Sequence, residues 1–115
     1  MRYNMIYNLA KEFTPTPFGR YISDGPKSAE KFRSILIPLL NECHKKNETL
    51  TIDLDDVPIG IGSSFLEETF GGVIREKEFN EHQLSEILII KSNEDKSYID
   101  EIREYIREAQ KVINQ

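Results

Sequence analysis

Residues 50–70, LTIDLDDVPIGIGSSFLEETF, decide the fold because they combine a strand, a glycine-containing loop and the start of a helix. Leu50, Ile52 and Leu54 alternate with polar residues, as on a half-buried strand. From Ser63 onward, apolar residues recur every three or four positions, which is typical of a helix with one buried face. A strand that leads through a short loop into a helix indicates the α/β class.

Similar patterns on both sides of this stretch predict the remaining elements. They are strands within residues 3–13, 19–22 and 86–91, and helices at residues 28–43, 63–74 and 95–113. The continuous apolar run at 86–91 predicts a central, buried strand, and the last helix is predicted to pack on the sheet. The order of elements predicts an α/β fold with a mixed, mostly parallel four-stranded sheet packed with about three helices.

The size and charge of the chain limit its domain count and its partners. With 115 residues, 38% hydrophobic and 30% charged, the sequence predicts one globular domain over residues 1–115. The formal net charge of −5 gives no basic excess to neutralise a phosphate backbone, so no nucleic-acid partner is predicted.

The same sequence predicts a cytoplasmic protein with no membrane partner. It contains no apolar run long enough to cross a bilayer, and its first residues are too polar for a signal peptide. The single cysteine, Cys43, falls on the apolar stripe of the first long helix. That position predicts a small buried hydrophobic residue in a reducing compartment.

The residues that most often carry metal or acid–base chemistry are widely spaced. His44 and His82 lie far apart in sequence without clustered cysteines, so no metal and no cofactor are predicted. Neither histidine is placed by sequence near Ser63, and the glycine pattern of a nucleophile elbow is absent, so no catalytic residue and no enzyme activity are predicted.

Two other polar stretches have simple structural interpretations. Asp53, Asp55 and Asp56 lack the spacing of a calcium loop, which favours a solvated strand end over a metal site. Residues 24–28, DGPKS, lack the spacing of a phosphate-binding loop, so turn geometry is favoured over nucleotide binding.

Ser63 and Ser64 have three open interpretations at the predicted start of the second helix. They could cap the helix, and Ser64 with Glu67 fits a capping box. Either could carry a phosphate, because the free backbone N–H groups and the helix dipole favour a negative group there. The third interpretation is ligand binding.

Residues 51–70 resemble the strand, loop, serine pair and helix of STAS domains in bacterial anti-anti-sigma factors. A closer resemblance, which covers most of the chain, is to the uncharacterised STAS-like domain family of bacteria. It is carried by PFGRY at 17–21, SDGP at 23–26 and GSSFLEETFGG at 62–72.

The resemblance to anti-anti-sigma factors implies a phosphorylation site. Those proteins carry an Asp-Ser-Ser-Gly motif in which a serine is phosphorylated by a partner ATPase kinase, and the phosphate ends the partnership. By resemblance Ser63 is that serine and Ser64 its neighbour. Gly62 stands where the motif has Asp, and Phe65 stands where it has Gly.

The resemblance implies a non-enzymatic regulatory protein-interaction module whose partner is an ATPase or sensor kinase of the anti-sigma type. The residues predicted for the partner-binding or anion-binding surface are Arg20, Asp24, Gly62, Ser63, Ser64 and Phe65. The alternative is a receptor for a small molecule, nucleotide or other anion at the same place, where Arg20 would reach an anionic group.

The neighbouring residues also have two interpretations. Arg20 and Asp24 are predicted to form a turn and a local ion pair. Phe18, Tyr21 and Phe79 lie outside the main helical stripes, which favours a role as core residues and leaves a partner surface as the alternative.

Overall fold

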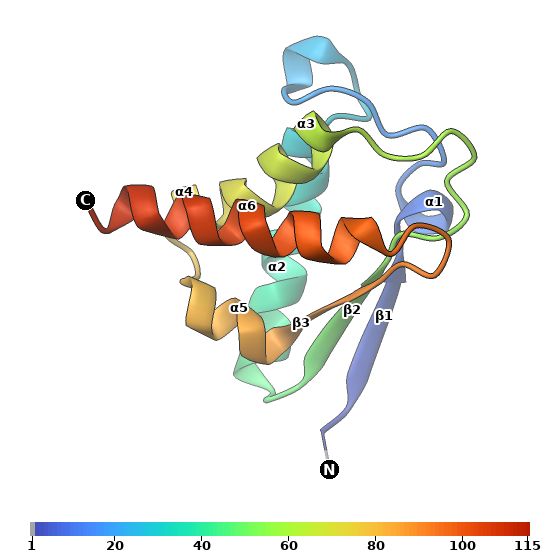
Figure 1. Ribbon diagram of the computed structural model, residues 1–115. Helices are drawn as coiled ribbons and strands as arrows, with labels where there is room; N and C mark the ends of the chain where they lie inside the picture. The colour runs from blue at the N-terminus through green and yellow to red at the C-terminus, as the bar shows by residue number, and fades with distance from the viewer. Residues whose placement is uncertain (1) are drawn as a thin grey trace.

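The computed structural model describes residues 2–115 and contains a three-stranded sheet (Figure 1). The strands are β1 (Asn4–Asn8), β2 (Thr49–Asp53) and β3 (Leu88–Lys91). Both pairings are parallel and the order is β1-β2-β3. The α/β class is therefore confirmed. The described sheet is parallel throughout, so the expected mixed pairing is wrong, and a fourth strand is not confirmed.

Residues 19–22, predicted as the fourth strand, form a tight turn that leads into the 3₁₀ turn η1 (Ile22–Asp24). The Asp24 carboxylate accepts hydrogen bonds from the backbone N–H groups of Arg20, at 3.0 Å, and Tyr21, at 2.9 Å. Those two donors are then occupied by a side chain instead of a neighbouring strand. Gly19 has a φ of 90°, and a side chain there would also collide with Asp24.

The helices comprise one continuous helical stretch and four separate elements. Their bounds are α1 (Leu9–Glu12), α2 (Ala29–Lys45), α3 (Ser63–Leu66), the π-helical segment η2 (Glu67–Gly71), α4 (Gly72–Arg75), α5 (Glu81–Ile87) and α6 (Ser97–Ile113). Elements α3, η2 and α4 follow one another without a break, as the single predicted helix. None of these helices combines the length and apolar character that crossing a bilayer demands.

Helix α5 was not predicted from the apolar pattern, although its first residues carry a recognisable signal. Asn80 accepts a hydrogen bond from the Gln83 backbone N–H at 2.8 Å, and the Gln83 side chain accepts one from the Asn80 backbone N–H at 2.9 Å. This is a capping box. The spacing of Asn80 and Gln83 could have located the start of the helix.

The helices cover one face of the sheet. The side chains of Leu50 and Ile52 point to that face and are fully buried. On the opposite face, Ile6, Thr51 and Ile89 share one row of the register, and Ile6 and Ile89 are exposed. Right-handed crossovers between strands that follow one another across a sheet place their helices on the same side.

The buried stripe of α2 forms the centre of the core. The fully buried positions are Ala29, Phe32, Leu36, Leu40 and Cys43. Ile35 and Leu39, which the apolar pattern also places on the stripe, are half-buried. The Phe32 ring packs against Tyr7, Phe13 and Phe65, with ring-centroid distances of 5.4–6.1 Å. The predicted buried position of Cys43 is confirmed.

Two predictions about packing are wrong. Strand β3 lies at an edge of the sheet and β2 at its centre, because β3 has only one neighbouring strand. Helix α6 packs mainly against η2 and α4 instead of the sheet, and Figure 1 shows it crossing the other helices. In each case apolar periodicity identified a buried face, but it did not identify the strand or helix against which that face packs.

The N-terminus of α2 provides a test of the capping geometry. Ser28 is buried, and its hydroxyl accepts a hydrogen bond from the Lys31 backbone N–H at 3.2 Å. Ser28→Ala is expected to lower the free energy of unfolding by about 1 kcal/mol in urea denaturation. Ser34→Ala, an exposed change in the same helix, is the control. Equal losses for both variants would contradict the capping role.

Candidate functional site

All six residues predicted for the partner-binding or anion-binding surface line one open groove. They are Arg20, Asp24, Gly62, Ser63, Ser64 and Phe65. The groove has a volume of about 530 Å³ and lies between residues 17–24 and the start of α3, so it is called here the α3 groove. The structure thus brings together two segments about 40 positions apart in sequence.

The two serines do not cap the helix. Gly62 is the N-cap residue of α3, and no side chain makes a capping hydrogen bond there. Ser63 and Ser64 are the first helical residues and both are exposed. The capping interpretation and the capping box of Ser64 with Glu67 are therefore wrong.

Ser63 lies beside a hydroxyl and carboxylate pair on α6. The Tyr105 hydroxyl donates a hydrogen bond to Glu101 at 2.6 Å, and this bond raises the pKa of Tyr105. A smaller contribution from the Ser63 hydroxyl acts in the opposite direction. The start of α3 therefore faces an acidic part of α6.

Arg20 makes long-range ion pairs in place of the predicted local one. Its guanidinium lies 2.6 Å from Glu67 and 3.3 Å from Glu68, both in the π-helical segment. Asp24 bonds the Arg20 backbone and does not pair with its guanidinium. The predicted turn at Asp24 is confirmed, and the predicted ion pair is wrong.

Glu68 is the buried centre of a larger network. Its side chain lies 3.0 Å from Arg33 and 3.6 Å from Arg75, in addition to Arg20. Arg33 also donates to the Glu68 carbonyl at 2.6 Å and pairs with Glu76. One carboxylate thereby joins the segment before α2, α2 itself, η2 and α4. This set is called here the Glu68 network.

Glu67 forms the half of the network nearer the solvent. Burial alone would raise the pKa of Glu67, but hydrogen bonds from Arg75 and Arg20 outweigh burial and lower it. The guanidinium pKa values of Arg20 and Arg75 are raised mainly by the same bonds. The stabilisation from Glu67 is therefore present above the ordinary glutamate range, and it is lost as pH falls through the lowered pKa.

The glycine pair where η2 meets α4 makes room for the network. A side-chain carbon at Gly72 would lie 2.5 Å from an Arg33 guanidinium nitrogen, and one at Gly71 would lie 2.7 Å from a Glu67 oxygen. The π-helical turn, a feature frequent at functional sites, carries both glutamates. The sequence motif 62–72 thus contains both the groove-lining serines and the residues that support them.

The exposed aromatic residues add an apolar wall to the α3 groove. Phe18 and Tyr21 line it and are 71% and 50% exposed, so their predicted role in the core is wrong. Phe79 is buried, as predicted, and contacts His44 edge-on. Exposed aromatic side chains beside a groove are typical of a contact surface.

Neither histidine lies in the α3 groove. His44 packs against Phe79, and His82 pairs with Glu86 at 2.8 Å on α5. The groove therefore combines exposed hydroxyls, aromatic rings and an arginine that is already paired. Such a set can contact another molecule through hydrogen bonds and apolar packing.

The acidic residues at the end of β2 and just after it have a structural role. The Asp55 carboxylate accepts backbone hydrogen bonds from Asn93 and Glu94, each at 2.9 Å, and Asp53 pairs with Lys91 at 3.3 Å. Asp53 and Asp55 are buried, so the predicted solvated strand end holds only for Asp56. These bonds tie the loop after β3 to the end of β2.

The Glu68 network is testable by removing its central charge. Glu68→Gln is expected to lower the free energy of unfolding by about 2 kcal/mol at pH 7, because Arg33 loses a buried, charged partner. Glu42→Gln breaks the exposed pair with Lys46 and is the control, with a much smaller expected loss because water screens that pair. Urea denaturation measures both, and similar small losses would refute a central role for Glu68.

Comparison with known proteins identifies the family. The family model described as a STAS-like domain of unknown function (DUF4325) matches residues 28–97, from the N-cap of α2 to the start of α6. The match includes Ser63 and Glu68 and excludes Arg20 and Asp24. No curated protein and no solved structure matches the chain. Because the match covers more than half of its length, the chain belongs to the family of STAS-like domains of unknown function.

Proposed function

We propose that this STAS-like domain is a regulatory protein-interaction module, without catalytic activity of its own, that binds a protein partner at the α3 groove. The observation that carries the proposal is the exposed serine pair at the start of α3, which lies in one groove with exposed Phe18 and Tyr21. Aromatic residues are enriched in protein interfaces because they bury a large area with few rotatable bonds.

Further exposed apolar residues lie close in sequence to the two segments that form the groove. Ile22 is 59% exposed in η1, next to Tyr21, and Ile59 is 93% exposed in the loop that leads to α3. Removing exposed apolar side chains from water stabilises a complex. These residues therefore support a protein partner over a small ion.

The charge distribution supports a protein partner over a free anion. In the α3 groove Arg20 is already neutralised by Glu67 and Glu68, so an anion would have to displace a carboxylate. This competition weakens the alternative of an anion or nucleotide receptor at this groove.

The same competition provides a physical basis for a phosphorylation switch at Ser63. A phosphate there would add up to two negative charges beside Glu101, and it would compete with Glu67 for Arg20. Repulsion and the loss of the Arg20 pair would both change the groove. We therefore propose that phosphorylation of Ser63, or of its neighbour Ser64, weakens partner binding.

The partner class follows from the resemblance to anti-anti-sigma factors. An ATPase or sensor kinase of the anti-sigma type would both bind the groove and phosphorylate the serine. The absence of a histidine from the residues that line the groove is consistent with phosphate transfer catalysed by the partner.

The test combines affinity capture from the organism's own cell extract with intact-mass analysis of the bait. We expect a co-purifying ATPase and a fraction of the bait heavier by about 80 Da, mapped to Ser63. With the purified partner, Ser63→Asp is expected to weaken binding at least about tenfold, whereas Ser63→Ala retains it.

Ser34→Asp supplies the matched control because Ser34 is exposed on α2, away from the groove. A folded Ser63→Asp variant that binds with unchanged affinity would remove the switch. Failure to recover any partner, together with an unmodified mass, would count against the interaction module.

A further inference from the structure

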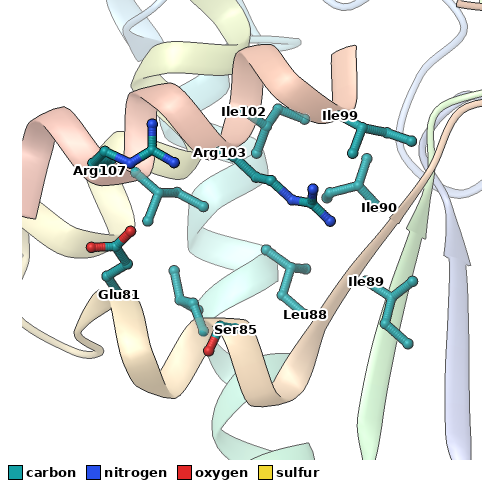
Figure 2. Close-up of a pocket in the computed structure, with 11 residues that line it drawn as sticks. Glu81, Ser85, Leu88, Ile89, Ile90, Ile99, Ile102, Arg103 and Arg107 are labelled. Carbon is teal, nitrogen blue, oxygen red and sulfur yellow. The ribbon is translucent and has the colours of Figure 1, made fainter. Parts of the chain in front are cut away.

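A second groove lies between α5, β3 and α6, and Figure 2 shows the side chains that line it. It has a volume of about 440 Å³, which is within the range of small-molecule sites. It shares no lining residue with the α3 groove. This groove is called here the α6 groove.

The floor of the α6 groove is apolar. Leu84 from α5 and Ile102 and Ile106 from α6 are buried there, and Leu88 and Ile90 from the edge strand β3 are half-buried. Because β3 has no neighbouring strand on its outer side, the groove opens along the edge of the sheet. Such a surface favours a hydrocarbon body over a polar one.

The rim carries a cation that the protein itself does not neutralise. Within residues 2–115, Arg103 is the one arginine with neither an ion pair nor a side-chain hydrogen bond. The other five bond to carboxylates or, for Arg2, to backbone carbonyls.

Arg103 is also placed over the groove. Figure 2 shows its side chain reaching from α6 towards Leu88 and Ile90, whereas the acidic side chain of the rim, Glu81, lies at the other end below Arg107. Arg107 is paired with Glu104 at 2.6 Å. The free positive charge therefore lies beside the apolar floor, and the negative charge lies away from it.

We propose that the α6 groove binds an amphipathic monoanion, a free acid with a medium-length hydrocarbon body. Arg103 binds the carboxylate and the leucine and isoleucine side chains enclose the hydrocarbon. A guanidinium provides two parallel N–H donors that match a carboxylate. This site is independent of the proposed partner interaction at the α3 groove.

Decanoate is the probe, titrated into the full chain below its micelle concentration and followed by calorimetry and amide NMR. We expect saturable binding, with shifted amide signals in α5, β3 and α6. Arg103→Gln should weaken decanoate binding at least about tenfold, because a charged hydrogen-bonded pair is lost. Lys111→Gln, on the same helix but outside the groove, is the control and should leave the affinity unchanged.

Two further measurements test whether the negative charge is needed and whether the ligand is a free acid or a membrane lipid. Decanol has the same hydrocarbon without the anion and should bind at least about tenfold more weakly than decanoate. Vesicles that contain an anionic phospholipid test a membrane source of the same chemistry, and no co-sedimentation is expected.

The proposal would be overturned if decanoate did not bind saturably, or if the native chain and Arg103→Gln bound decanoate equally. It would also be overturned if the chain bound anionic vesicles alone. Ser85→Phe adds a ring at the exposed rim and should abolish binding of decanoate without removing the cation. Retained affinity in that variant would place the ligand elsewhere.

Discussion

The buried carboxylate of Glu68 is the group on which the candidate site depends. A carboxylate removed from water is costly unless it is paired, and Glu68 has Arg33 at 3.0 Å, Arg20 at 3.3 Å and Arg75 at 3.6 Å. These arginines come from three different segments. Because they share Glu68 as a partner, the segment before α2 is held against the π-helical turn. The α3 groove lies between that segment and the start of α3.

Different residues of this arrangement hold the groove in shape and face the solvent. Glu68 and the glycine pair of the 62–72 motif hold the helix and the arginines in place, and the preceding serines remain exposed. The groove therefore presents Ser63 on a surface whose lining arginine, Arg20, is already bound to Glu67. A partner surface with an exposed modifiable serine follows more directly from these contacts than a preformed anion site.

Local patterns predicted the elements whose stability is local. Apolar periodicity predicted the stripe of α2, the strand at residues 50–54 and the last helix. The family resemblance is carried by residues 17–21, 23–26 and 62–72, and part of each stretch lines the α3 groove.

Long-range contacts explain what sequence reasoning missed. The Arg20 pair spans 47 positions, so nothing near Arg20 indicated that Glu67 would take its charge. The place of β3 at an edge depends on which strands neighbour it, and its apolar run is compatible with either position. The helix begins at Ser63, as predicted, but which residue is its N-cap depends on one residue of register, which propensities do not resolve.

Site-specific photo-crosslinking in growing cells tests the central claim that the α3 groove is the partner surface. A photoreactive phenylalanine analogue replaces Phe18 at the groove or, as the control, Val112, which is 62% exposed near the end of α6. The account predicts a discrete protein adduct from position 18 and none from position 112. An adduct from position 112 alone, or no protein adduct from either, would contradict it.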